Sequence, residues 1–414
     1  MQLKTRHIQA ALATILAVTS FASSPRSEVV SFDGRTTYYR EGSPYGKMTV
    51  INPSVDIGAK PWDFLRLNAG WQADIVSGAS VKTRNAIRGQ SADAVTTASV
   101  KDFRQAIRGG FGLERKLTSI DAGYTYSFEN DYKSHSIDIT AKAELLQRST
   151  ELSVAYARNW DDVCDREQSD PDPTLRKPLE SSTLCFKADQ PLTPALGRLT
   201  THSIAIDSIQ GGWTQAWTPT FATQATLSVQ MMQGFLSNPY REVNIGNNST
   251  AQEYLPDVRI RYAAGLRANW YLKPLKTALR VGGRAYRDTW NIRSVTAELE
   301  LERYVLLDAL RIRARGRYYN QSHAVFYSDD YLISATSKYF TGDRELAKMR
   351  SLLAGLRLAY GPSAGSKRFL GIMEKFEVSL GADYVWYSYD DFTVGFESLK
   401  KTALIASFGF TLLF

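Results

Sequence analysis

The 414-residue sequence contains no long hydrophobic run beyond its N-terminal segment, and its mean hydropathy is −0.28. A transmembrane helix requires about 20 consecutive apolar residues, so a bundle of membrane-spanning helices is excluded. Cysteine and histidine are scarce, with two and four residues. No CxxC, CxxCH or cysteine-histidine cluster occurs, which argues against zinc, haem attachment and dithiol chemistry. A soluble two-domain protein, a secreted all-β protein and an outer-membrane barrel remain.

The N-terminus has the composition of a secretory signal. A basic start precedes the apolar stretch IQAALATILAV, and Ser20 and Ala22 supply the small residues that a signal peptidase reads. The stretch is too short for a membrane anchor. We therefore predict a cleaved signal peptide at 1–22, a short lead at 23–28 and one domain at 29–414.

Most of the remaining sequence alternates apolar and polar side chains. Clear examples are FLRLNAGWQADI at 64–75, IDAGYTYSF at 120–128, SIDITAKAEL at 136–145 and FEVSLGADYVW at 376–386. Runs of about ten residues with period two are typical of strands that cross an outer membrane. The same alternation also fits a soluble β-protein with one buried face.

The lengths of the connections separate these two interpretations. Short connections such as KPWD, LTS, RST, TPTF, KPLK and YVLLD alternate with long polar ones near 77–101, 161–197, 237–256 and 323–345. A membrane barrel has short periplasmic turns and long extracellular loops, whereas a β-sandwich has no reason to sort its loops. Including a weak first run at 29–40, we predict an all-β fold, a single antiparallel transmembrane β-barrel of about 16 strands.

The segment TAELELERYVLLDALRIRARGRYY carries two rows of charge of opposite sign, each at every second position. Good helix formers dominate it, but a helix would scatter its arginines around the cylinder. An antiparallel hairpin explains both rows. The register we predict pairs Glu302 with Arg311, Glu300 with Arg313 and Glu298 with Arg315, and leaves Arg317 without an opposite carboxylate.

The polar faces of the late strands are rich in arginine, and those of the early strands are acidic. We predict as pore-lining residues Arg259, Arg261, Arg267, Arg280, Arg284, Glu298, Glu300, Glu302, Arg311, Arg313, Arg315, Arg317 and Arg357. The early strands contribute Asp56, Asp74, Asp121, Asp138 and Glu144. Such a split would create a transverse field that favours anionic solutes, or the charges pair and only hold the wall in shape. The better selectivity candidates are Arg259, Arg261, Arg280 and Arg284, which have no alternating acidic partner in their own hairpin.

The two cysteines, Cys164 and Cys185, lie in one polar segment that no strand pattern crosses. Exported proteins mature in an oxidising compartment, so we expect a disulfide that stabilises the fold by roughly 3 kcal/mol. The same segment holds Asp161, Asp162, Asp165, Glu167, Asp170 and Asp172. These acids could bind calcium or bridge lipopolysaccharide cations, but they lack the ligand spacing of an EF-hand, which favours a solvated loop.

Tryptophans occur at the ends of the predicted strands. Trp62, Trp217 and Trp270 lie beside short turns, and Trp160 and Trp290 lie at the opposite ends. We interpret them as two interfacial girdles, the alternative being ordinary core tryptophans.

The sequence ends in SFGFTLLF, which resembles the C-terminal signal read by the outer-membrane assembly machinery. Its pattern is polar Ser407, then Gly409, apolar Leu412 and terminal Phe414.

Four segments resemble the domain of unknown function 3570 family, which is predicted to consist of Gram-negative outer-membrane proteins. They are ADIVSGASV, LSNPYREV, YRDTWNIRSVTAELELERYV and HAVFYSDDYL. The resemblance implies a barrel in the outer membrane and carries over no catalytic residues. Genes of this family often lie beside those for a periplasmic thioredoxin-like protein, a small lipoprotein and a flavin transferase, which hints at redox chemistry nearby.

The function that we predict is a porin-like channel for polar or anionic solutes, without a cofactor. The alternative is a closed barrel that scaffolds a periplasmic or lipoprotein partner, with a link to redox chemistry in the sense that the family's gene neighbours indicate. A minor alternative is an outer-membrane hydrolase. His135 and His323 have serine and aspartate neighbours, but no nucleophile elbow or metal-ligand spacing supports an enzyme. We expect lipid, lipopolysaccharide and the assembly machinery as partners. Nucleic acid is not expected, because the arginines alternate along inward-facing strands and form no exposed basic patch.

Overall fold

The computed structural model describes most of the chain after residue 29. The described residues are 30–43, 46–78, 93–95, 102–179, 185, 198–246, 249–306, 309–329, 338–361, 375–394 and 397–414. The predicted signal peptide and lead lie outside them. None of the helices in these ranges has the length and hydrophobicity that a membrane crossing requires.

Sixteen antiparallel strands form a closed barrel, as the sequence predicts. They are β1 (Val30–Ser43), β2 (Gly46–Trp62), β3 (Leu65–Gly78), β5 (Asp102–Arg115), β6 (Thr118–Phe128), β7 (Tyr132–Leu145), β8 (Thr150–Arg166), β9 (Leu199–Thr218), β10 (Phe221–Gly234), β13 (Val258–Leu272), β14 (Thr277–Asp288), β15 (Arg293–Val305), β16 (Leu310–Gln321), β17 (Met349–Tyr360), β18 (Lys375–Val394) and β19 (Glu397–Leu413). Each pairs with the barrel strands before and after it, and β1 pairs with β19 to close the wall.

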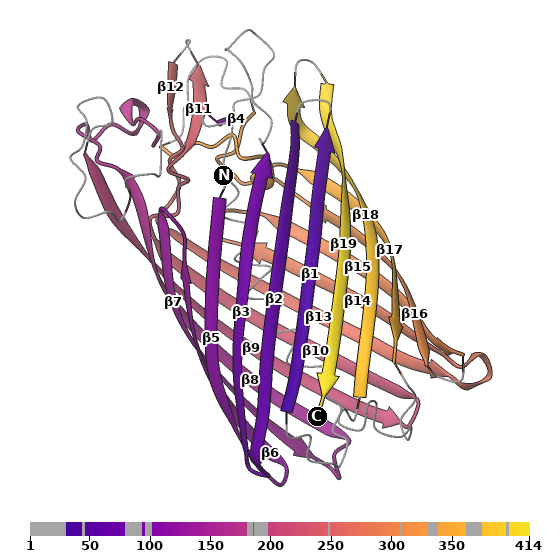
Figure 1. Ribbon diagram of the computed structural model, residues 1–414. Helices are drawn as coiled ribbons and strands as arrows, with labels where there is room; N and C mark the ends of the chain where they lie inside the picture. The colour runs from indigo at the N-terminus through magenta and orange to yellow at the C-terminus, as the bar shows by residue number, and fades with distance from the viewer. Residues whose placement is uncertain are drawn as a thin grey trace.

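Short elements lie between the barrel strands. The strands β4 (Asp93–Val95), β11 (Arg241–Gly246) and β12 (Ser249–Gln252) form a separate small sheet beyond one end of the barrel (Figure 1). The 3-10 helices are η2 (Pro173–Leu175), η3 (Lys273–Leu275) and η4 (Arg344–Leu346).

The two ends of the barrel differ in the length of their connections. At one end, which we call the turn rim, strands are joined by tight turns such as 63–64, 116–117 and 219–220. At the other end, the loop rim, the long connections follow β3, β8, β10 and β16. The sorting predicted from the sequence is therefore present, with one departure: β17 and β18 are joined at the turn rim by a connection that spans 361–374.

The outer face of the wall is apolar and the inner face is polar. Leu352, Leu356 and Phe408 represent the outer face and are each about half exposed, as lipid-facing side chains are in the isolated chain. Charged side chains alternate with them. The inner face is identified by ion pairs that skip a strand: Arg311 on β16 bonds Glu377 on β18 at 2.6 Å. Side chains converge on a concave surface and diverge on a convex one, so such contacts require the inside of the barrel.

The last strand follows the same alternation. Phe408 and Phe410 lie on the outer face of β19 with Leu412, whereas Ser407 and Gly409 lie on the inner face opposite β1 and β18. Gly34 in β1 leaves room for the Phe410 ring, because a Cβ at this glycine would lie 2.4 Å from two ring carbons. The terminal segment thus closes the barrel.

Candidate functional site

The charged hairpin forms as predicted, but in a different register. In β15 and β16, Glu302 faces Arg313, Glu300 faces Arg315 and Glu298 faces Arg317. The predicted pairing is therefore wrong by two residues. The cause is a tighter turn than expected, since strand pairing continues to Val305 and Leu310. A shift of two residues keeps every side chain on its face and changes only its partner.

This register changes which arginine lacks a carboxylate within the hairpin. Arg311, not Arg317, is the exception, because Tyr304 lies opposite it. Its guanidinium instead bonds Glu377 two strands away. Arg315 behaves similarly: its Nε donates to Asp383 Oδ1 on β18 at 2.8 Å.

Two of the four predicted selectivity arginines have acidic partners. Arg259 Nε donates to Asp288 Oδ2 at 2.9 Å within its own hairpin, and both side chains are buried. Arg280 bonds Glu300 and also contacts Glu302 on β15. The expectation of no acidic partner within the hairpin is therefore wrong for Arg259, because the loop-rim end of β14 supplies Asp288. It holds for Arg280, whose carboxylates lie on the next strand, β15, so Arg280 is paired all the same.

The other two selectivity candidates, together with Arg357, have no carboxylate within 4 Å in the described part of the chain. Arg261 Nη1 donates to Gln230 Oε1 at 3.0 Å, and the Arg284 guanidinium lies 6.0 Å from the centre of the Tyr286 ring. Arg357 Nη2 donates to the Ser379 hydroxyl at 3.0 Å. Of the remaining predicted residues, Arg267 and Arg317 both approach Glu298 at 3.6 Å.

The early strands are less one-sided than predicted. Arg66 on β3 bonds Asp121 on β6 at 2.9 Å, and Arg108 lies 3.9 Å from Asp138. Asp74 accepts a hydrogen bond from the Asn52 amide at 2.7 Å. Basic side chains therefore offset much of the acidic row, and the transverse field inferred from the acidic residues alone is overestimated.

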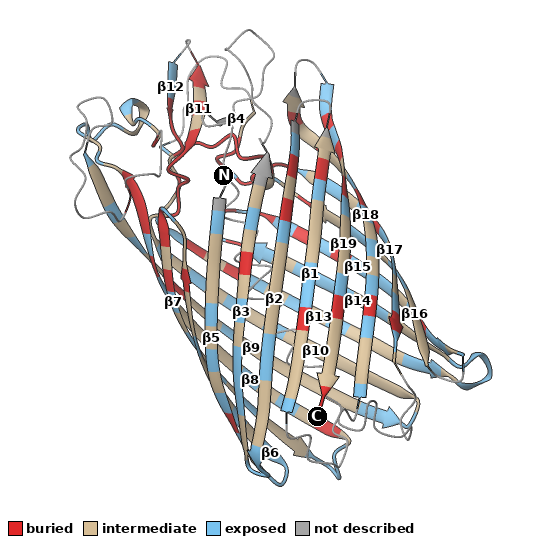
Figure 2. Cartoon of the chain, viewed as in Figure 1, coloured by how far each residue is buried: buried red, intermediate tan, exposed pale blue. Residues whose placement is uncertain are grey.

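Segments at the loop rim pack into a hydrophobic core, which we call the rim cap. It consists of Leu236, Leu255, Trp290, Ile292, Ala324, Phe326, Tyr327, Leu346, Ala347, Tyr389, Phe392 and Leu399. These residues come from two long loops, one short turn and the ends of two strands. Buried residues accordingly gather toward this end of the barrel (Figure 2).

Buried ion pairs tie the rim cap to the wall. Arg344 of η4 donates to Glu41 of β1 at 2.8 Å, and Lys401 of β19 donates to the same carboxylate at 2.9 Å. Burial by itself lowers the pKa of Arg344, but the Glu41 carboxylate more than reverses this effect, so the pKa lies above its usual value. In the loops, Arg241 bonds Asp343 at 2.7 Å.

The expected disulfide joins Cys164 and Cys185, whose Cα atoms are 5.9 Å apart. Both cysteines pack with Leu179 and Tyr240 in a small buried cluster. Cys164 lies within β8, which continues to Arg166, so the expectation that no strand crosses this segment is wrong. The end of β8 is buried on both faces, with Val163, Cys164 and Asp165 each less than 5% exposed, so it lacks the alternation that marks the other strands.

Part of the acidic segment is buried and not solvated. Asp161 accepts a hydrogen bond from the Tyr132 hydroxyl, and Asp165 accepts one from the Gln252 amide at 2.8 Å. Asp172 caps η2, and its hydrogen bonds from the Thr174 backbone and hydroxyl lower its pKa. No group of three or more histidine, cysteine, aspartate or glutamate side chains with metal-binding geometry occurs in the ranges the structure describes.

The tryptophan girdle is only partly as predicted. Trp62, Trp217 and Trp270 are more than half exposed near the turn rim, and Trp160 is 43% exposed toward the loop rim. Trp290 is 2% exposed and belongs to the rim cap, with the Arg259 guanidinium 4.2 Å from its ring centre. Its assignment to a girdle is therefore wrong.

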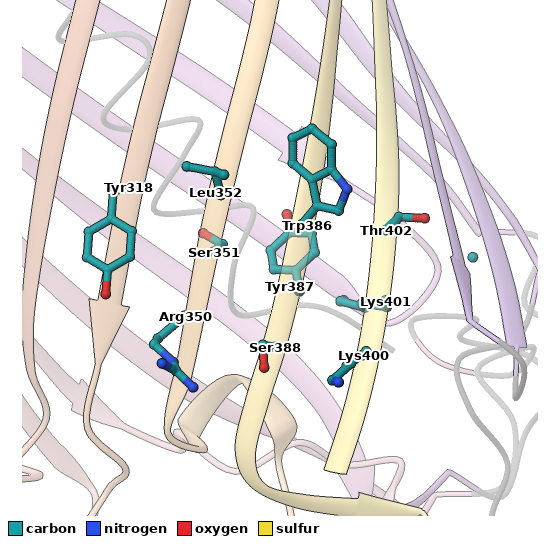
Figure 3. Close-up of a pocket in the computed structure, with 11 residues that line it drawn as sticks. Tyr318, Arg350, Ser351, Leu352, Trp386, Tyr387, Ser388, Lys400, Lys401 and Thr402 are labelled. Atoms are coloured by element: carbon teal, nitrogen blue, oxygen red, sulfur yellow. The ribbon is translucent and has the colours of Figure 1, made fainter. Parts of the chain in front are cut away.

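A pocket on the outer face lies near the loop-rim ends of β17, β18 and β19. Register places Arg350, Ser388 and Lys400 in one row across these strands, and Leu352 and Trp386 in the next row toward the turn rim. Figure 3 shows the two cationic side chains nearer the strand ends than Trp386. Asp390 bonds Arg350 at 3.0 Å, and no carboxylate in the described ranges lies within 4 Å of Lys400.

A closed antiparallel barrel with an apolar outer face, a charged inner face and long loops at one rim defines an outer-membrane β-barrel protein. The chain belongs to the family described as Protein of unknown function (DUF3570), which matches residues 7–368. The resemblance of the sequence to this family is thereby confirmed.

Solved structures with a similar fold include several outer-membrane proteins. A bacterial polysaccharide outer membrane secretin has 10% sequence identity and a TM-score of 0.49, with 94% of this chain and 99% of that chain covered. OccK2 (OpdF) of Pseudomonas aeruginosa has 8% identity and a TM-score of 0.41, with 93% and 97% covered. OmpT of Vibrio cholerae has 10% identity and a TM-score of 0.42, with 93% and 99% covered. No curated protein matches the chain.

Proposed function

We propose that this protein is an outer-membrane channel for polar solutes with a preference for anions. The observation that carries the proposal is a set of inner-face arginines without a carboxylate partner among the described residues: Arg261, Arg284 and Arg357. A guanidinium stays protonated at every physiological pH, so these side chains are permanent positive charges. Paired arginines contribute little net field, whereas unpaired ones attract anions.

The size of the barrel supports a channel. A barrel of about 16 strands is wide enough to leave an aqueous passage unless loops fill it. Charged rings and walls of this kind select ions by sign. The proposed location is the bacterial outer membrane, reached after cleavage of the signal peptide, with the long loops outside the cell.

Planar-bilayer recordings test this function. Purified, folded protein is expected to give discrete openings, and a KCl gradient is expected to give a reversal potential on the anion-selective side. Substituting Arg261→Gln, Arg284→Gln and Arg357→Gln together should reduce this selectivity. The matched control is Arg315→Gln with Asp383→Asn, which removes a bonded pair without changing the net charge. A folded protein that never opens would overturn the proposal.

The rim cap favours a second function, a closed barrel that scaffolds a periplasmic or lipoprotein partner. Its hydrophobic core and buried ion pairs hold two long loops against the end of the wall. Crosslinking in intact membranes followed by purification tests it. A reproducible partner together with zero conductance would favour the scaffold, and conductance without a partner would favour the channel. An outer-membrane hydrolase gains no support from His323 in the described part of the chain: its imidazole bonds Asp391 at 2.8 Å, and its ring centre lies 6.3 Å from that of Tyr327.

The outer-face pocket supports lipopolysaccharide as a membrane partner. Arg350 and Lys400 lie above Leu352 and Trp386, so phosphate groups could meet the cations while acyl chains lie on the apolar surface. The Arg350→Gln, Lys400→Gln variant should then retain less lipopolysaccharide through purification than the wild type, measured by phosphate content. The assembly machinery remains the second proposed partner, through Ser407, Gly409, Leu412 and Phe414.

A further inference from the structure

The strands β17, β18, β19 and β1 are neighbours in the wall (Figure 1). Their inner face carries Arg35 and Arg357, neither of which has a carboxylate within 4 Å in the described ranges. In one row of the sheet, Gly381 lies between Arg357 and Ser407. In the adjacent row, Gly409 lies between Ser379 and Arg35. Each glycine thus lies directly between an arginine on one neighbouring strand and a serine on the other.

The glycines leave space that neighbouring side chains enter. A Cβ at Gly381 would lie 2.6 Å from the Ser407 hydroxyl oxygen. A Cβ at Gly409 would lie 3.0 Å from the Ser379 hydroxyl oxygen and 3.9 Å from Arg35 Nε. The Ser407 hydroxyl therefore lies over Gly381, and the Ser379 hydroxyl and the Arg35 guanidinium lie over Gly409, in space that a side chain would otherwise fill.

Arg357, on β17, reaches the Ser379 hydroxyl from the opposite side of β18 to Arg35. Its Nη2 donates to the Ser379 hydroxyl at 3.0 Å, and its Nε is buried without a hydrogen-bond partner. Arg35 is the strongest like charge acting on it. One guanidinium group thus bonds Ser379, and the other lies across Gly409 from the same serine.

No acid nearby forms an ion pair with Arg35 or Arg357 within 4 Å in the described ranges. Asp33, two residues from Arg35 on the same face, accepts a hydrogen bond from the Thr411 hydroxyl at 2.5 Å. Glu377 attracts Arg357 weakly but is bonded to Arg311 at 2.6 Å. Asp56 interacts with Arg35 electrostatically but forms no ion pair with it within 4 Å in the described ranges. Arg313, the other cation facing Arg357, is bonded to Glu302. Two like charges held together without a carboxylate are unfavourable unless an anion lies between them.

We propose that Arg35, Arg357, Ser379 and Ser407 form a binding site for an oxyanion, the carboxylate or phosphate group of a solute that passes along the wall. Guanidinium forks match the oxygens of both groups, and the hydroxyls donate further hydrogen bonds. We call this site the oxyanion cradle. The cradle rests on the proposed function, because a solute must enter the barrel to reach it. It adds a defined binding step to the channel's preference for anions.

Equilibrium binding to the full-length, folded protein in detergent tests the cradle directly. Isothermal titration with inorganic phosphate and, separately, with acetate is expected to give saturable binding. The Arg35→Gln, Arg357→Gln variant should bind at least about 10-fold more weakly, since a charge-assisted hydrogen bond contributes more than one factor of ten in affinity. Folding of each variant is checked by heat-dependent mobility in gels.

Three further variants separate the cradle from general electrostatics. Arg40→Gln with Arg287→Gln removes the same charge from exposed positions on the outer face and should leave binding unchanged. Gly381→Ala with Gly409→Ala keeps every charge but places a Cβ in the cradle, so it should weaken binding. Arg35→Lys with Arg357→Lys keeps the charge without the fork and should bind more weakly than the wild type.

The outcomes distinguish this inference from the channel itself. Saturable binding that survives Arg35→Gln with Arg357→Gln, or no saturable binding by the wild type, overturns the cradle even if the protein conducts. Binding that is lost in this variant supports the cradle even if no channel opens, in which case only the channel proposal fails. Binding of phosphate but not acetate would restrict the solute class to phosphate-bearing compounds.

Discussion

The rim cap and the inner wall use the same charged residue types under opposite conditions. In the cap, the side chains of Arg344, Glu41 and Lys401 are each 6–7% exposed and share one carboxylate. On the wall, the side chains of Arg315 and Arg317 are 49% and 43% exposed. The charges that hold the cap are thus removed from water, whereas Arg315 and Arg317 on the wall remain hydrated.

This difference decides what each ion pair does. Removing one partner from a buried pair leaves an uncompensated charge, which is strongly destabilising, whereas an exposed pair contributes about 0–1 kcal/mol. The cap pairs therefore fix loop positions. The wall pairs cancel charge locally, and in the proposed channel the unpaired arginines then define the potential. Substitutions in the buried network of the cap and in the exposed pairs of the wall test this contrast.

Glu41→Gln should release the rim cap. Arg344 and Lys401 would lose their shared carboxylate while still buried, at a cost of roughly 3–5 kcal/mol. We expect faster hydrogen exchange at 338–348 and faster proteolysis of this loop, with the barrel still folded. Glu298→Gln is the matched control, because its side chain is 44% exposed on the wall. Equal proteolysis of both variants would contradict the role of the buried network.

Cys164→Ser should lower the free energy of unfolding of the neighbouring loop by roughly 3 kcal/mol, because the disulfide closes a segment with a sequence separation of 21 residues. The small cluster with Leu179 and Tyr240 would lose its covalent link. We expect hydrogen exchange to rise at 167–179 and to stay unchanged at the turn rim. A wild-type protein that takes up thiol reagents without prior reduction would show that the bond does not form.

Glu302→Gln tests the most buried carboxylate of the charged hairpin. Its side chain is 8% exposed and bonds both Arg280 and Arg313, so the loss should be about 1.5–3 kcal/mol. The measurement is the free energy of unfolding in urea with the barrel in lipid vesicles. A loss no larger than that of an exposed wall pair would show that burial does not set the strength of these contacts.

The sequence predicted the wall better than the cap for a physical reason. Alternation of period two specifies which face each side chain occupies, so the barrel, its strand number and the charged inner face follow from local patterns. The register of β15 against β16 does not follow from alternation, because the turn near Leu306 sets it. The two-residue error in the pairing of Glu302 with Arg311 has this origin.

The rim cap depends on contacts that no local pattern contains. Arg344 and Glu41 are 303 residues apart, and Lys401 and Glu41 are 360 apart. Trp290 looks like a girdle residue by its position at a strand end, yet loops cover it. The proposed oxyanion cradle likewise has no local pattern, since Arg35 and Arg357 come into neighbouring rows only after β1 and β19 close the barrel. An arginine without a nearby alternating acid was the available signal for Arg357.

Arg317→Gln should have the smallest effect on stability. Its guanidinium lies 3.6 Å from Glu298, and both side chains are more than 40% exposed, so we expect a change of about 0–1 kcal/mol in the free energy of unfolding. Glu298 would keep its contact with Arg267 at 3.6 Å. The urea measurement used for Glu302→Gln provides the comparison on the same hairpin. If Arg317→Gln destabilised the barrel as much as Glu302→Gln, hydration would not separate the two pairs, and the contrast between cap and wall would need another cause.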